Sequence, residues 1–83
     1  MSGVLIATIP KNGTEELRVS LDAFNGYDLI NLRVWFRSAD GDQHPGKAGL
    51  AMRIEALPEL IAALSKAEKE ARAHGLIPAG VVP

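Results

Sequence analysis

Apolar and polar residues alternate along much of the first two thirds of the chain. The alternation is clearest between Tyr27 and Arg37, inside a longer stretch that runs to Ile54. A period of two places successive side chains on opposite faces of a β-strand, so the segment predicts a long two-faced strand. Its apolar face carries Ile30, Leu32, Val34 and Phe36, and its other face carries Asn31, Arg33, Trp35 and Arg37.

Two earlier segments also predict strands. Val4–Ile9 is a short β-branched run closed by Pro10, which suits an edge strand because proline cannot donate to a central ladder. Glu16–Phe24 alternates again, and the pair Asn25-Gly26 after it is typical of a tight hairpin turn, since both residues tolerate positive φ. The second and third strands are therefore predicted to pair antiparallel.

The segment after the long strand predicts a loop and then a fourth strand. Ser38–Lys47 is rich in glycine, proline and aspartate, a composition that favours a chain reversal. Gly49–Ile54 then resumes the alternation, with aliphatic residues on one face and Arg53 on the other. Three strands thus share the same division into an aliphatic face and an arginine-bearing face.

A change of period marks the one predicted helix, from about Ala56 to His74. Pro58 suits its first turn, and Gly75 suits its end. Apolar residues recur at helical spacing and form one stripe. The stripe consists of Leu57, Leu60, Ile61, Leu64, Ala67 and Ala71.

These elements predict an α+β fold, in which a four-stranded antiparallel sheet is followed by one C-terminal helix that covers the aliphatic face. Residues 1–75 are predicted to form a single domain, and residues 76–83 an apolar tail that is loose or docked on a partner. A chain of 83 residues has a thin core, which favours self-association. The arginine-bearing face is expected to stay open.

Composition narrows the function. The net charge is -1 and the chain has no cysteine, which argues against a basic protein that coats nucleic acid, a disulfide framework and a thiol nucleophile. The apolar opening of the chain is too short for a signal peptide or a membrane span, so a cytoplasmic location is expected. No nucleophile, base and orienting group share a spacing typical of catalysis, and no cofactor is implied, so an enzyme is not expected.

The arginine-bearing face is the candidate site. Arginine pairs with phosphates in a fixed fork, and exposed aromatic rings stack on unpaired bases. Because a duplex hides its base faces, the pattern indicates a single-stranded nucleic acid as ligand. An ordinary solvated sheet face, or burial of Trp35 in a dimer interface, explains the same residues. The face collects Arg18, Arg33, Arg37 and Arg53 with Phe24 and Trp35, against Asp22 as its single acid.

The predicted loop offers a weaker signal. Asp40, Asp42 and His44 stand at alternate positions, as metal ligands can. Turn formation explains the same residues, and the distal glutamate of a calcium loop is missing at the required spacing. No metal site is predicted, and His44 is expected to contact phosphate or solvent.

Two longer segments carry a family resemblance. RVSLDAFNGYDLINLRVWF corresponds to a strand, an aromatic turn and a strand that ends in paired aromatics, and DGDQHPGKAGLAM to an acidic glycine turn, a basic residue before proline, a basic pair and an aliphatic strand. In these features residues 18–64 resemble the bacterial branch of the positive cofactor four family of transcriptional coactivators. The resemblance implies a small α+β domain that dimerises through its helices and binds single-stranded DNA on its sheet surfaces.

Residue by residue, the resemblance places the turn aromatic of the family on Phe24, its strand arginine on Arg33 and its aromatic pair on Trp35 and Phe36. The basic residue before proline becomes His44, and the basic pair becomes Lys47 and Ala48. Basic positions around the turn become Asp22, Asn25 and Tyr27, so positive charge is lost there. Strict alternation puts Phe36 on the aliphatic face, whereas the family uses this ring for stacking, and a bulge would reconcile the two.

The resulting hypothesis is a homodimer that binds single-stranded DNA, with RNA as the alternative, and acts in transcription regulation near the nucleoid. Its expected partners also include the transcription machinery. The competing hypothesis is a protein-interaction or structural dimer of the same fold with weak nucleic-acid affinity. The proposed stacking residues are Phe24, Trp35 and Phe36, and the proposed phosphate-binding residues are Arg18, Arg33, Arg37, Lys47 and Arg53, with His44 beside them.

Overall fold

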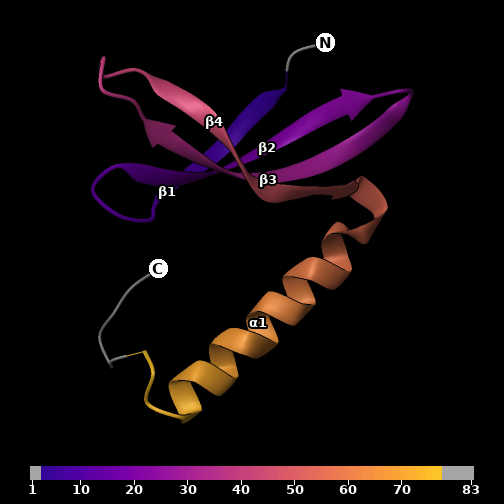
Figure 1. Ribbon diagram of the computed structural model, residues 1–83. Coiled ribbons are helices and arrows are strands. Elements are labelled where there is room, and N and C mark those ends of the chain that lie inside the picture. The colour runs from indigo at the N-terminus through magenta and orange to yellow at the C-terminus, as the bar shows by residue number, and fades with distance from the viewer. Residues whose placement is uncertain (1–2, 78–83) are drawn as a thin grey trace.

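In the computed structural model, which describes residues 3–77, four strands form one antiparallel sheet and a single helix follows them (Figure 1). The elements are β1 Val4–Pro10, β2 Glu15–Phe24, β3 Tyr27–Arg37, β4 Gln43–Arg53, the 3₁₀ turn η1 Ile54–Ala56 and the helix α1 Leu57–Ala73. The strand order is β1-β2-β3-β4, so each strand pairs with its neighbour in the chain. The predicted α+β class is confirmed. Most of the predicted tail lies outside the described residues.

The β2–β3 hairpin forms where the sequence predicts it. Asn25 and Gly26 adopt positive φ values of 51° and 81°, and Phe24 pairs with Tyr27 across the turn. Positive φ at both central residues is the signature of a type I′ turn, whose twist matches that of the flanking strands. The register continues without a shift from this turn to the pair Glu15 and Phe36, so the two longest alternating segments present matching faces.

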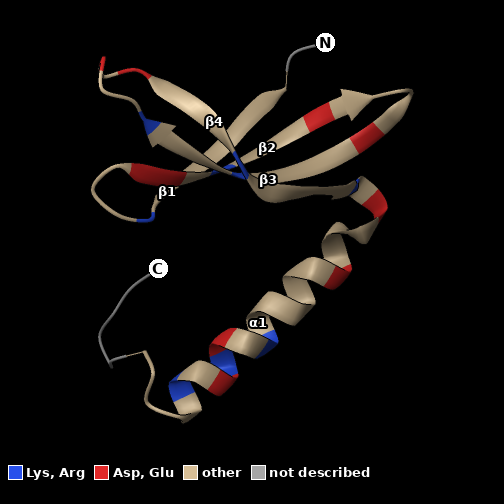
Figure 2. Ribbon diagram, viewed as in Figure 1, with Lys and Arg blue, Asp and Glu red and all other residues tan. Residues whose placement is uncertain are grey.

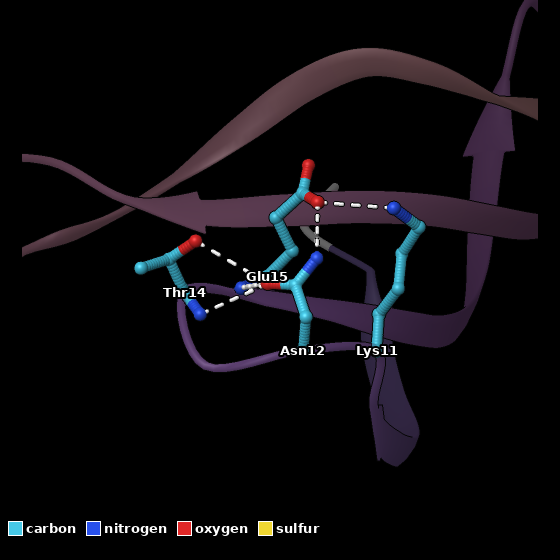
Figure 3. A network of polar contacts seen from close by, with 4 residues as sticks. All are labelled: Lys11, Asn12, Thr14 and Glu15. Carbon is cyan, nitrogen blue, oxygen red and sulfur yellow. Dashed lines mark hydrogen bonds and ion pairs between the residues drawn. The ribbon is translucent and has the colours of Figure 1, made fainter.

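A polar network closes the connection between β1 and β2 (Figure 3). The Asn12 side-chain oxygen accepts hydrogen bonds from the backbone N–H groups of Thr14 and Glu15, at 3.0 and 2.9 Å. The Glu15 carboxylate in turn accepts from the Asn12 amide at 2.7 Å and from the Lys11 ammonium at 3.0 Å. Asparagine stabilises turns through such side-chain bonds to nearby backbone groups. Turn formation alone therefore accounts for the residues of this loop.

The strand β4 begins earlier than the sequence predicts. It starts at Gln43 instead of Gly49, so the predicted loop Ser38–Lys47 is wrong over its second half, and the connection shrinks to residues 38–42. Proline is tolerated in β4 because this strand lies at the edge of the sheet, where one row of N–H groups has no ladder partner. From composition alone, Pro45 is predicted to lie in a loop.

Two glycines that look like turn residues serve another purpose in β4. A Cβ atom at Gly49 would lie 2.4 Å from the backbone oxygen of Leu32, and one at Gly46 would lie 2.8 Å from that of Val34. The absence of a side chain therefore allows β4 to approach β3 closely. Arg33 pairs with Gly49 while Trp35 pairs with Pro45, so extra residues bulge from β4 between these two pairs.

The short connection between β3 and β4 is held by its own polar groups. The backbone N–H of Ser38 donates to the Asp42 carbonyl at 2.9 Å, and that of Gly41 donates to the Ser38 carbonyl at 2.9 Å. The Asp40 carboxylate accepts from the Asp42 N–H at 3.0 Å and from the Ser38 hydroxyl. These bonds hold the pKa of Asp40 below its ordinary value. Among residues 3–77, no three or more His, Asp or Glu side chains lie close enough together to hold a metal ion.

The end of α1 agrees with its sequence signals. The backbone N–H of Leu76 donates to the Ala71 carbonyl at 2.8 Å, that of Gly75 donates to the Arg72 carbonyl at 3.1 Å, and Gly75 has a positive φ of 71°. This pair of bonds is a Schellman motif, which requires a residue that adopts positive φ readily. Within residues 3–77, α1 lacks the length and apolar character that crossing a membrane requires.

The placement of α1 differs from the prediction. The helix was expected to cover the aliphatic face of the sheet, but it contacts mainly η1 and extends away from the strands (Figure 1). Its stripe is open, with Ile61 55% and Leu64 57% exposed, and only Ile30 is a buried apolar residue in the described chain. The helix follows β4 after a single 3₁₀ turn, which directs it outward and not back across the sheet. One chain therefore leaves both the stripe and the aliphatic face uncovered.

Candidate nucleic-acid interface

Strand pairing gathers the predicted arginines on one surface of the sheet, called here the polar face. Arg18 lies directly opposite Arg33 across β2 and β3, and Ser20 lies opposite Asn31. Like charges directly opposite each other are unfavourable unless each has a partner, so the contacts of the two arginines are informative. The described residues of this face on the central strands are Glu16, Arg18, Ser20, Asp22 and Phe24 on β2, and Tyr27, Leu29, Asn31, Arg33, Trp35 and Arg37 on β3.

Arg18 combines an ion pair with an aromatic contact. Its Nε lies 2.6 Å from a Glu16 carboxylate oxygen, and its guanidinium carbon lies 4.0 Å from the centre of the Trp35 ring. This geometry is a cation–π contact. Glu16 lies on the polar face as well. Asp22 is therefore not the single acid of this face. A guanidinium carries five N–H donors, so the bond to Glu16 leaves others free for a ligand.

The side chain of Arg33 binds backbone carbonyls of the neighbouring strand β4. Its Nη1 donates to the carbonyl of Gly46 at 3.1 Å and lies 3.4 Å from that of Lys47. Both carbonyls belong to the bulged part of β4, so Arg33 ties the bulge to β3. The exposed side chain of Lys47 thus comes from a segment whose backbone Arg33 holds in place.

A second pairing of arginine and aromatic ring occupies the hairpin end of the polar face. The guanidinium carbon of Arg53 lies 4.0 Å from the centre of the Tyr27 ring. Tyr27 is 50% exposed, and Phe24, its partner across the turn, is 66% exposed. Tyr27 was not among the predicted site residues. Its position on the same strand and the same face as Trp35 is the signal that identifies it.

Phe36 and His44 lie on the other face of the sheet. They pair across β3 and β4, and their ring centres are 5.8 Å apart. The His44 Nε2 also lies 3.1 Å from the Ser38 hydroxyl. The bulge that could have turned Phe36 toward the arginines occurs in β4, and β3 keeps its alternation through Phe36. The structure does not bring these two rings together with the arginines of the polar face.

The polar face is hollowed in two places. The larger hollow has a volume of about 380 Å³ and includes Arg18, Arg33 and Trp35 in its lining. The smaller has a volume of about 220 Å³ and lies at the loop end, where Arg37, Gln43 and the β1–β2 connection line it. Arg37 thus lines a different hollow from Arg18 and Arg33. Acidic and basic residues are interspersed along the second half of α1, whereas β2 begins with two adjacent acids, Glu15 and Glu16 (Figure 2).

An open antiparallel sheet that displays arginines and aromatic rings, followed by one helix, defines a class of small open-faced α+β domains. The chain belongs to the family described as Transcriptional Coactivator p15 (PC4), whose model matches residues 11–63. The family resemblance predicted from the sequence is confirmed.

Solved structures agree with this assignment. The chain is similar to a PC4 homologue from Burkholderia pseudomallei in two crystal forms. The tetragonal form has 31% identity and a TM-score of 0.74, over 81% of this chain and 98% of the homologue. The orthorhombic form has 32% identity and a TM-score of 0.76, over 83% and 93% of the two chains.

A bacteriophage T5 homologue of the eukaryotic coactivator PC4, implicated in recombination-dependent DNA replication, shares the fold. It has 21% identity and a TM-score of 0.66, over 92% of this chain and 97% of the phage chain. Among curated proteins, none matches this chain significantly.

Proposed function

We propose that this protein binds single-stranded DNA through the polar face and acts in transcription regulation. The observation that carries the proposal is the stacking of Arg18 on Trp35, repeated by Arg53 and Tyr27 on the same face. Each pair offers a cation for a phosphate beside a ring for a base. Membership of a family of transcriptional coactivators supports the DNA-related role.

The exposure of the rings favours an unpaired strand. Phe24 and Tyr27 are at least half exposed at the hairpin end, where a base can stack on them. Base stacking on an aromatic side chain contributes about 1 to 3 kcal/mol per base, and a duplex keeps its base faces inside the helix. RNA has the same stacking surfaces, so competition between oligodeoxythymidine and oligouridine decides between the two polymers.

A homodimer is the second part of the proposal. The α1 stripe and the aliphatic face of the sheet are both apolar and both open in one chain. Large exposed apolar surfaces on a folded protein mark interaction sites. A second copy supplies a matching apolar surface for each of them, and a two-fold arrangement covers all four surfaces at once. In the cell the dimer would be cytoplasmic and associated with the nucleoid, in contact with the transcription machinery.

Titration with oligodeoxythymidine tests the DNA-binding part directly. Trp35 is the only tryptophan of the chain, so its fluorescence reports on the polar face. We expect quenching on binding at low salt, with an affinity that falls as salt rises, because neutralised phosphates release counterions. The slope of log affinity against log salt counts these phosphates. Unchanged fluorescence together with no retention of labelled oligonucleotide at low salt would contradict the proposal.

A protein-interaction dimer with weak nucleic-acid affinity is the competing function. The ion pair between Arg18 and Glu16 and the internal bonds of Arg33 support it, because both lower the positive charge that a phosphate meets. Under this alternative Arg18→Ala leaves oligonucleotide retention unchanged. Under the DNA-binding proposal the same variant weakens retention and lowers the salt slope.

A further inference from the structure

The two pairings of arginine and aromatic ring on the polar face differ in one respect. Arg53 lies over the Tyr27 ring and forms no ion pair in the part of the chain that the structure describes. Arg18 lies over the Trp35 ring and also binds the Glu16 carboxylate, with 2.6 Å between Nε and Oε2. A carboxylate repels phosphate groups, so an acid in this position needs an explanation other than phosphate binding.

The ion pair between Arg18 and Glu16 is largely withdrawn from water. The two side chains are 25% and 22% exposed, respectively. Ion pairs on an exposed surface contribute little because water and salt screen them, and partial burial reduces this screening. The two residues lie on the same face of β2 because they are two positions apart on one strand. The bond to Glu16 thus fixes the Arg18 guanidinium in one position in the free protein.

This position covers a ring on which a base could stack. The Arg18 guanidinium carbon lies 4.0 Å from the centre of the Trp35 ring, which is van der Waals contact. A stacked nucleobase needs the same space against the ring face. Glu16 lies directly opposite Trp35 across β2 and β3, so carboxylate, guanidinium and ring form one cluster. While Arg18 stays in this cluster, the ring face beneath it is closed to a base.

A phosphate group can take the place of the carboxylate. Both are anions that accept N–H bonds from the fork of a guanidinium. Nε is the only Arg18 donor with a bond in the described chain, so the Nη groups can bind a phosphate before the bond to Glu16 breaks. Transfer of Arg18 to the phosphate then moves the guanidinium away from the Trp35 ring. One exchange therefore supplies both a cation for the phosphate and a ring face for a base.

We propose that Glu16 acts as a latch on the polar face. It holds Arg18 over Trp35 in the free protein, and a single strand binds when one of its phosphates replaces Glu16 as the partner of Arg18. The proposal rests on the proposed single-strand binding and adds the regulation of that site. The latch lowers the affinity of this ring for a strand, whereas the pair of Arg53 and Tyr27 binds without releasing an acid.

Glu16→Gln tests the latch, because it keeps the size of the side chain and removes its charge. Binding of labelled oligodeoxythymidine, followed by fluorescence anisotropy at low salt, should become about fivefold tighter, the value of one ion pair. In an Arg18→Ala background the same substitution should bring no gain, because no guanidinium remains to be released. Acrylamide, a neutral probe of ring exposure, should quench Trp35 fluorescence more strongly in the free Glu16→Gln protein than in the wild type.

Two matched variants separate the contact from the charge. Asp22→Asn removes a negative charge from the same face, where Asp22 accepts hydrogen bonds from Ser20 and Asn31 and has no ion-pair partner in the described chain. It should tighten binding less than Glu16→Gln does. Glu16→Asp keeps the charge but shortens the side chain by one methylene group. It should loosen the bond to Nε and raise the quenching by acrylamide.

The outcomes distinguish the latch from the function on which it rests. Equal gains in Glu16→Gln and Asp22→Asn, or a gain that survives in the Arg18→Ala background, would overturn the latch and leave DNA binding in place. Acrylamide quenching that is the same in the wild type and in both Glu16 variants would also overturn it. Failure of the wild type and of every variant to bind oligodeoxythymidine at low salt would overturn the proposed function itself.

Discussion

Arg33 on β3 donates a hydrogen bond from Nη1 to the carbonyl of Gly46 on β4, across a distance of 3.1 Å. The bond crosses the place where the register of the two strands shifts. A guanidinium that binds backbone carbonyls in this way directs its charge inward and has less to offer a phosphate. Arg33 is therefore better described as a residue that positions the β4 bulge than as a phosphate ligand.

Arg33→Ala is expected to loosen the bulge and to weaken oligodeoxythymidine binding through Lys47. Loss of hydrogen bonds from a charged group should lower the free energy of unfolding by about 1.5 to 3 kcal/mol. In a double-mutant cycle on binding, Arg33→Ala and Lys47→Ala should have less than additive effects, because both remove the same phosphate contact. Full additivity would argue against the positioning role. Arg72→Ala, on the exposed end of α1, serves as the matched control.

Tyr27→Ala is expected to reduce the binding free energy for oligodeoxythymidine by about 1 to 3 kcal/mol, the value of one stacked base. Tyr27→Phe keeps the ring and the contact with Arg53, so it should bind nearly as well as the wild type. Fluorescence anisotropy of a labelled oligonucleotide measures both. If Tyr27→Ala binds with wild-type affinity, Tyr27 has no place in the site.

Leu64→Glu is expected to convert the dimer to a monomer, because it places a charge in the middle of the apolar α1 stripe. Lys66→Glu changes a residue of the same helix outside the stripe and should leave the dimer intact. Sedimentation equilibrium at micromolar concentration distinguishes the two masses. A wild-type protein that sediments as a monomer under these conditions would refute the proposed dimer.

Gly49→Ala is expected to lower the free energy of unfolding by about 1 to 3 kcal/mol, the cost of backbone strain at one residue. The new Cβ would lie 2.4 Å from the Leu32 oxygen, and Gly49 has a positive φ of 152°. Gly13→Ala is the control, because a Cβ there meets nothing within 4 Å. Urea denaturation should show a much lower midpoint for the first variant only. Equal midpoints would mean that β4 can move away from β3 at no cost.

Glu15 links stability to pH through the β1–β2 connection. The Asn12 amide, followed by the Lys11 ammonium, lowers the pKa of Glu15 from its ordinary value of 4.5. A carboxyl whose pKa is lower in the folded state stabilises the fold above its unfolded pKa, and this contribution is lost as pH falls through the folded pKa. Glu15→Gln should therefore unfold at a urea midpoint that depends less on pH below 4.5 than that of the wild type. Asn12→Ala should reduce the dependence in the same direction, and a dependence unchanged in both variants would exclude this contribution.

Local patterns in the sequence were enough to predict the central hairpin. The alternation of β2 and β3 and the Asn25-Gly26 turn involve residues close together in the chain, so the faces of Arg18, Arg33 and Trp35 follow from parity alone. The early start of β4 could not be predicted in this way, because proline and glycine occur both in loops and in edge strands. Their role depends on which strand lies beside them.

Contacts that depend on register were also beyond the sequence. The contact of Arg18 with the Trp35 ring and the bond from Arg33 to Gly46 require knowledge of which residues face each other across strands. Tyr27, in contrast, was predictable, because it shares a strand and a face with Trp35.

The sequential strand order has a consequence for how the molecule folds. Each strand meets its partner across a short connection, so little chain entropy is lost when any one hairpin closes. Proteins dominated by such local contacts fold quickly, and the β2–β3 hairpin with its two-residue turn is the most local starting point. The sheet can then grow outward by adding β1 and β4 to a structure that already exists. In the proposed dimer, association of two copies would be a later, concentration-dependent step that acts on a preformed sheet.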